Sequence, residues 1–184
     1  MLKSHLIAFA EPFQAGQTRK YSDEPILEHW NRVAEASEAL EPDRQKCAYE
    51  IALFHDLIED TTCDMDQLVQ FLQASNYPAT AVEQIQAGVE WLTEKYTRHA
   101  YPMLNRKERN ILEAYRLGDA PALIQTIKYC DIADNLPSIA HMDPGFARKW
   151  IPEKIIAVQQ MTEGHADKRS ALLEDLHEAL MRLV

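Results

Sequence analysis

The sequence predicts an all-α fold, and three observations support this class. Apolar residues recur at helical spacing along almost all of the 184 residues. No segment alternates apolar and polar residues with the period of a strand. The chain has five glycines, whereas an all-β fold needs many tight turns. We therefore expect helices at residues 2–10, 25–40, 42–60, 64–75, 80–95, 105–117, 121–137, 147–161 and 168–183.

Prolines, glycines and short polar side chains mark the ends of these helices. Pro25, Pro42 and Pro121 stand in first turns, where the missing backbone N–H has no partner to lose. Asp64 is suited to cap the helix that follows it. The predicted connections are a polar loop at residues 11–24, a turn at 61–64, a break at 76–78, a basic aromatic loop at 96–104 and a turn at 141–145, with Gly118 and Pro137 ending two helices.

Length and composition favour one globular domain over residues 1–184. The apolar fraction is 46% and the charged fraction is 26%, which are ordinary values for a folded soluble protein. The motifs described below lie at about residues 16–136, and the C-terminal helices at 146–184 lie outside them. Those helices either complete the core or form a homo-oligomeric contact, and the sequence leaves both readings open.

Charge and cysteine usage exclude several classes of function. A net charge of −10 makes the chain a poor ligand for nucleic-acid backbones. Cys47, Cys63 and Cys130 are odd in number and widely spaced, so neither a disulfide framework nor a thiolate zinc site fits. The N-terminus lacks the apolar core of a signal peptide, and no segment approaches the roughly 20 apolar residues that span a bilayer. We expect a cytoplasmic protein without nucleic-acid or membrane partners.

One segment concentrates residues that bind metal ions. His55 and Asp56 are adjacent, and Glu59 and Asp60 follow one helical turn later. Helical spacing would place His55 with Glu59, and Asp56 with Asp60, on one face. Crowded carboxylates repel one another unless a cation compensates their charge. One imidazole and one carboxylate do not fill a coordination sphere, so further ligands must come from other helices.

His29 and Asp131 are the candidates for these further ligands. A set of two histidines and two aspartates suits Mn²⁺, Fe²⁺ or Zn²⁺ and leaves positions for water and a substrate oxygen. Asp134 lies three residues after Asp131 and competes for the same role. Each element alone also has an ordinary structural reading. His55 and Asp56 could be a surface or capping pair, the acids at 59 and 60 could be a solvated helix end, and His29 could be a hydrogen-bonded, partly buried histidine. Only the combination indicates a metal site.

Several short segments match the motifs of one known family. Residues 53–61 (LFHDLIEDT) follow the pattern HD-x-x-ED-T, and Lys128, Asp131 and Asn135 keep the spacing K-x-x-D-x-x-x-N. Further similar segments are GQTRK at 16–20, PILEH at 25–29, LT at 92–93 and KER at 107–109. On these motifs the chain resembles the HD-domain superfamily and, more narrowly, the RelA/SpoT-type (p)ppGpp hydrolases, including the small stand-alone alarmone hydrolases.

The resemblance implies a helical bundle of about eight to nine helices and a metal-dependent reaction. The implied reaction is hydrolysis of ppGpp or pppGpp at the 3′-position, which releases pyrophosphate. The implied cofactor is one divalent ion, usually Mn²⁺. Asn135 would contact the ribose or a water on the metal, Arg19 would lie against the purine, and Lys20 or Lys128 would meet phosphate. The implied metal ligands are His29, His55, Asp56 and Asp131; the implied catalytic residues, which position and deprotonate water, are Glu59 and Asp60; the implied substrate-binding residues are Arg19, Lys20, Lys128 and Asn135.

Two other functions remain open at this stage. Gln14, Trp30, Ile132 and Pro137 differ from the residues common in the family, at positions expected to face the nucleotide or to end helices. These differences motivate a second hypothesis, a 5′-deoxynucleotidase or an NADPH-type phosphatase that releases inorganic phosphate. A third hypothesis is a nucleotide-binding module without turnover. A synthetase activity is not expected, because the chain ends soon after the hydrolase-like region.

Overall fold

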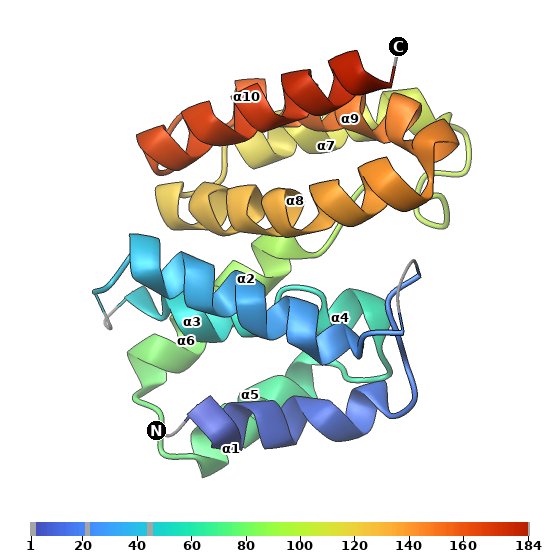
Figure 1. Ribbon diagram of the computed structural model, residues 1–184. Coiled ribbons are helices and arrows are strands. Elements are labelled where there is room, and N and C mark those ends of the chain that lie inside the picture. The colour runs from blue at the N-terminus through green and yellow to red at the C-terminus, as the bar shows by residue number, and fades with distance from the viewer. Residues whose placement is uncertain (1–2, 21–22, 44–45, 184) are drawn as a thin grey trace. The chain divides into compact units, whose positions relative to one another are not determined.

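The computed structural model describes residues 3–20, 23–43 and 46–183 (Figure 1). Within these residues every regular element is a helix, and the one β-bridge is the isolated pair Thr18 and Pro25. The predicted all-α class is therefore confirmed. The chain divides into two compact units, Met1–Thr93 and Glu94–Val184, and each unit is described by itself.

The first unit contains the helices that carry the histidines. Its elements are α1 (Lys3–Ala10), the short 3₁₀ helix η1 (Glu11–Gln14), α2 (Ile26–Leu40), α3 (Ala48–Leu53), α4 (Leu57–Asp60), α5 (Met65–Ala74) and α6 (Ala79–Leu92).

The core of the first unit is built around α2, α3 and α6. Helix α2 buries Trp30, Val33, Ala34 and Ser37, and this spacing is that of one helical face. Helix α3 packs against both α2 and α6. A Cβ atom on Gly88 of α6 would lie 2.7 Å from a side-chain carbon of Ile51 on α3, so only glycine permits this close approach. The end of α3 is thereby held in place, and that end leads directly into His55.

The predicted helix at 42–60 is wrong in its extent. Cys47 has a left-handed backbone with φ 52°, so the helix begins only at Ala48. It ends at Leu53, and a turn at 54–56 separates it from α4. All residues from 51 to 55 are buried, and no single face of a straight helix can bury so many consecutive side chains. The turn solves this problem, because it directs both the Phe54 ring and the His55 ring into the interior.

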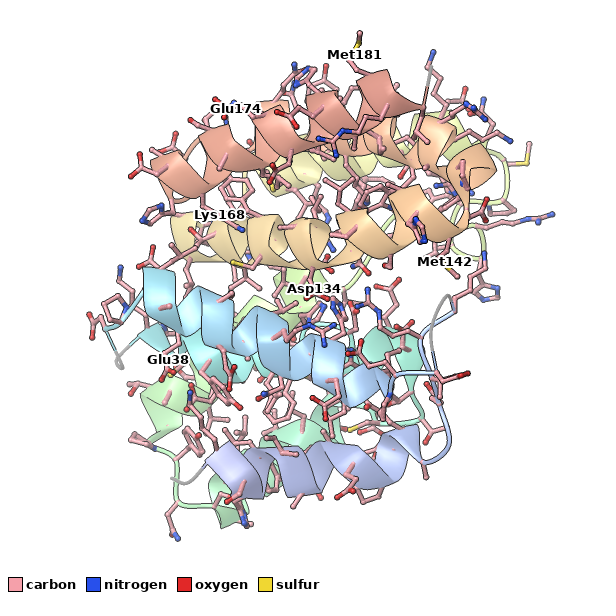
Figure 2. All side chains as sticks on the ribbon, in the orientation of Figure 1. Glu38, Asp134, Met142, Lys168, Glu174 and Met181 are labelled. Carbon is pink, nitrogen blue, oxygen red and sulfur yellow. The ribbon has the colours of Figure 1, made fainter. Side chains whose placement is uncertain are left out.

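The second unit is made of long helices, drawn from yellow to red in Figure 1. They are α7 (Arg106–Gly118), α8 (Ala122–Met142), α9 (Pro144–Gln160) and α10 (Ala166–Arg182). Helix α9 packs against α7, α8 and α10. In Figure 2, Glu174 and Met181 project from α10 away from α8 and α9. Met181 is 74% exposed. No helix among the described residues has the length and apolarity to cross a membrane.

A buried glutamine joins three segments of the second unit. The Gln125 side-chain nitrogen donates to the carbonyl oxygens of Gly118 and Ala120, at 3.0 and 2.9 Å. Its side-chain oxygen accepts from the backbone N–H groups of Glu163 and Gly164, at 2.8 and 3.2 Å. The start of α8 is therefore tied to the end of α7 and to the connection between α9 and α10. Two charged residues of the candidate site, Lys128 and Asp131, follow on the same helix.

The predicted end of a helix at Pro137 is also wrong. Helix α8 continues through Pro137 to Met142, although an interior proline removes one backbone hydrogen bond and costs about 3 kcal/mol. Leu136 and Ile139 on either side are buried, and their burial offsets this cost. The predicted turn at 141–145 shrinks to Asp143, whose carboxylate accepts from the N–H of Phe146 at 2.9 Å and caps α9.

Candidate metal centre

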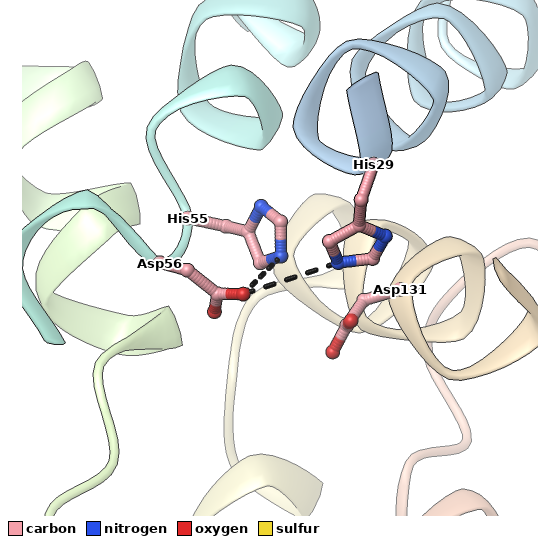
Figure 3. Close-up of side chains that lie close together, drawn as sticks. All are labelled: His29, His55, Asp56 and Asp131. Atoms are coloured by element: carbon pink, nitrogen blue, oxygen red, sulfur yellow. Dashed lines mark ion pairs between the residues drawn. The ribbon is translucent and has the colours of Figure 1, made fainter. Parts of the chain in front are cut away.

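The first unit brings three predicted ligands together. His29 comes from the first turn of α2, and His55 and Asp56 come from the turn between α3 and α4 (Figure 3). The two histidines are 3% and 0% exposed. One ligand atom from each of the three residues lies within 4.8 Å of the others. The Asp56 Oδ2 atom is 3.0 Å from Nε2 of His55 and 3.9 Å from Nε2 of His29.

The backbone determines which nitrogen of His55 faces the centre. The Nδ1 atom of His55 lies 2.7 Å from the carbonyl oxygen of Ala52. A carbonyl oxygen only accepts, so Nδ1 carries the proton and donates. In neutral His55, Nε2 then presents a lone pair toward the Asp56 carboxylate, and this contact is repulsive unless a cation or a proton lies between them. Two nitrogens and a carboxylate oxygen in this arrangement fit a divalent metal ion.

The second unit brings together three other predicted residues, all on α8. Asp131 is 6% exposed. Its Oδ1 atom accepts from the Asn135 side-chain nitrogen at 2.7 Å, and its Oδ2 atom lies 2.7 Å from the Lys128 ammonium. Lys128 and Asn135, which the resemblance assigns to substrate, therefore hold both oxygens of Asp131 in one orientation. Asp134 lies on the same helix and is half-buried.

The two predicted catalytic acids end α4. Glu59 and Asp60 are both exposed. The backbone N–H of Asp60 donates to the Asp56 carbonyl at 2.9 Å, so one helical turn joins Asp56 to Asp60. The expectation that His55 belongs to the same uninterrupted helix as these acids is wrong, because the turn at 54–56 lies between α3 and α4.

A carboxylate that the sequence did not single out holds Arg19. The Arg19 guanidinium lies 3.6 Å from Oε2 of Glu24, and the Arg19 N–H donates to the Glu24 carbonyl at 2.9 Å. Arg32 also binds Glu24, at 2.6 and 3.0 Å. The Arg32 hydrogen bond, helped by Arg19, lowers the pKa of Glu24 despite its partial burial. No periodic pattern links these three positions, so the contact is visible only in the folded chain. Lys20, the next residue, is exposed.

Three of the four positions that differ from the family pattern are buried, and the fourth, Pro137, is exposed. Trp30 and Ile132 are 0% and 1% exposed and belong to the cores of their units, so the expectation that they face a nucleotide or end a helix is wrong. Pro137 is an exposed residue inside α8. Gln14 is buried at the end of η1. The differences at Trp30 and Ile132 thus reflect packing rather than substrate choice.

Comparison with known proteins supports the fold. No protein-family model matches the sequence, and neither does any curated protein. The structure is similar to a solved structure of a metazoan ortholog of SpoT that hydrolyzes ppGpp and plays a role in starvation responses. The TM-score is 0.72, the sequence identity is 18%, and the match covers 97% of this chain and 93% of that chain. The chain therefore has the fold of a SpoT-type hydrolase, as the motifs predicted.

Proposed function

We propose that this protein is a metal-dependent phosphohydrolase that removes the 3′-diphosphate of ppGpp or pppGpp as pyrophosphate and leaves GDP or GTP. One observation carries the proposal: the buried cluster of His29, His55 and Asp56, with Nε2 of His55 directed at the Asp56 carboxylate. This cluster occurs in a chain with the fold of a SpoT ortholog that hydrolyzes ppGpp.

The fourth ligand in this proposal is Asp131, with the two units acting as one domain. Asp131 is supported over Asp134 by its burial and by the partners on both of its oxygens. Metal ligands are commonly held in this way by neighbouring groups. A divalent ion at this set would polarise a phosphoryl oxygen and make water a stronger acid. Mn²⁺ is the proposed ion, and the ligand set also accepts Fe²⁺ or Zn²⁺.

Glu59 and Asp60 supply the base. One of these carboxylates takes a proton from the attacking water while the other orients it. The water oxygen bonds to the phosphorus next to the 3′-oxygen, the bond from that phosphorus to the 3′-oxygen breaks, and the 3′-oxygen takes up a proton. The position of both acids at the exposed end of α4, one turn after Asp56, suits groups that must reach water and substrate.

The remaining predicted residues bind the nucleotide. Arg19 lies against the purine, and its pairing with Glu24 limits the orientations of the guanidinium. Lys20 is exposed, and we propose that its ammonium binds a phosphate of the substrate. Lys128 and Asn135 hold Asp131, and we propose that they also reach a phosphate and the ribose when substrate is bound.

The test is a product analysis with purified, Mn²⁺-loaded protein. ppGpp, pppGpp, deoxynucleoside monophosphates and NADPH are incubated separately, and pyrophosphate and inorganic phosphate are quantified in each reaction. We expect pyrophosphate with GDP or GTP from the first two substrates. Inorganic phosphate from the other substrates, with ppGpp left intact, would establish the second hypothesis instead. Binding of ppGpp without any product would indicate a non-catalytic module.

A further inference from the structure

The buried face of α9 contains one charged side chain. Trp150, Ile151, Ile155 and Val158 are buried, and their spacing is that of a single helical face. Lys154 lies within this face, four residues after Trp150, and its ammonium stands 5.7 Å from the centre of the Trp150 ring. A leucine or methionine at this position would pack without desolvating a charge.

The surroundings of Lys154 leave its charge undercompensated. Burial, followed by repulsion from Lys128, lowers the pKa of Lys154, while Asp131, Glu153 and Glu94 act in the opposite direction. Two of these carboxylates are engaged elsewhere. Glu153 binds Arg106 with both oxygens, at 2.9 and 2.7 Å, and Asp131 binds Lys128 at 2.7 Å. Among the residues that the structure describes, no carboxylate forms an ion pair with Lys154.

A partly buried ammonium without a paired anion destabilises a fold. An anion that arrives from solution would therefore compensate the charge of Lys154. Its neighbours indicate which anion. Lys128 is a second ammonium on α8, which packs against α9, and two such charges suit the oxygens of a phosphate chain.

We propose that Lys154, acting with Lys128, binds the 3′-diphosphate of the substrate and the pyrophosphate that forms from it. The identity of the nucleotide rests on the proposed function, whereas the ligand class, a short phosphate chain, does not. The 3′-diphosphate is favoured over the 5′-diphosphate because Asp131 is the proposed metal ligand. The phosphorus that is attacked must lie next to the metal, so a cation near Asp131 meets the group that is hydrolysed.

The experiment measures binding separately from turnover. Inorganic pyrophosphate and GDP are titrated into Mn²⁺-loaded protein by calorimetry, for the wild type and for Lys154→Met and Lys154→Arg. Lys149→Met is the matched control, because Lys149 lies on the same helix and is exposed. Melting temperatures without ligand and KM for ppGpp complete the set. If Lys154→Met fails to fold, Lys154→Gln takes its place.

We expect Lys154→Met to weaken pyrophosphate binding about 10- to 100-fold, as for the loss of one charged hydrogen bond, and to raise KM. Lys154→Arg and Lys149→Met should bind pyrophosphate within a few-fold of the wild type, GDP binding should not change, and Lys154→Met should melt no lower than the wild type. An unchanged pyrophosphate affinity in Lys154→Met would overturn the proposal. It would also be overturned if this variant lost affinity for GDP to the same extent, or if it melted at a lower temperature while its pyrophosphate binding stayed intact.

The two proposals fail in different ways. The hydrolase function would be refuted if the wild type left ppGpp intact. The phosphate site would still stand if the wild type bound pyrophosphate and Lys154→Met bound it more weakly. Normal hydrolysis of ppGpp, with the same KM and pyrophosphate affinity in Lys154→Met, would retain the function and refute the site.

Discussion

The imidazole of His55 is locked by the backbone of Ala52, whose carbonyl oxygen lies 2.7 Å from Nδ1 of the ring. The bond spans three residues across the end of α3. It leaves Nε2 directed at Asp56. A neighbouring backbone acceptor that fixes the tautomer is common for histidines that bind metals, and this relationship is the basis of the first prediction.

Removing either histidine should abolish metal binding. His29→Ala and His55→Ala each delete one of few ligands, so we expect Mn²⁺ to be lost on gel filtration while the wild type retains about one ion per chain. The measurement is metal content by mass spectrometry, with circular dichroism to verify folding. The matched control is His177→Ala, because Nδ1 of His177 lies 2.6 Å from the Leu173 carbonyl in a similar helical contact, but the residue is exposed on α10. Stoichiometric metal in His55→Ala would remove the basis of the candidate centre.

Asp131 and Asp134 should differ in their effect on the metal. We expect Asp131→Ala to lose the ion and Asp134→Ala to keep it, because the Asp131 carboxylate is buried and oriented by Lys128 and Asn135. Both variants are compared by metal content and by product formation from ppGpp. Retained metal in Asp131→Ala together with loss in Asp134→Ala would transfer the ligand role to Asp134.

The acids of α4 should affect the chemical step and not the metal. We expect Glu59→Gln and Asp60→Asn to lower kcat by about 10²- to 10⁴-fold, the usual contribution of a general base, with metal content unchanged. Glu83→Gln on α6 is a suitable control, since Glu83 is an exposed acid elsewhere in the same unit. Full activity in both single variants and in the double variant would exclude these residues as the base.

The close approach of α6 to α3 should make Gly88 sensitive to a single methyl group. Alanine normally stabilises a helix relative to glycine, but a Cβ atom here would lie 2.7 Å from Ile51. We expect Gly88→Ala to lower the free energy of unfolding by about 1–3 kcal/mol, as for an overpacked core. Urea titration measures this change. For Gly145→Ala, where the nearest atom to the new Cβ lies at 3.7 Å, we expect no loss; equal stability of the two variants would contradict the packing argument.

The cysteines should be unreactive in the folded protein. Burial raises the pKa of the thiols of Cys47 and Cys63 to about 11, and Cys130 is also buried. The thiolate is the reactive form, and with a pKa near 11 only about one thiol in a thousand is ionised at pH 8. Ellman's reagent at pH 8 should therefore detect no rapidly reacting thiol in the native protein and all three after denaturation in urea. A rapid native reaction would show that at least one thiol is accessible.

Local patterns in the sequence were sufficient for the helical class and for several helix ends. Asp64 caps α5 as predicted, and its carboxylate accepts from the Gln67 N–H at 2.8 Å. Asn105 caps α7 in the same way, at 3.0 Å from the Glu108 N–H. Caps of this kind depend on residues three positions apart, so a linear sequence contains all the information that they require. The motif around His55 and Asp56 was also readable, because its residues are adjacent.

What the sequence determined by itself was therefore the helical class, the caps and the identity of the candidate ligands. Only the tertiary structure decided that α3 stops at Leu53 so that His55 turns inward, that α8 continues through Pro137, and that Lys154 lies in a buried helical face. The physical reason is the same in each case. Burial against helices distant in sequence outweighs local preference by a few kcal/mol, and the partners in that burial are known only once the chain has folded.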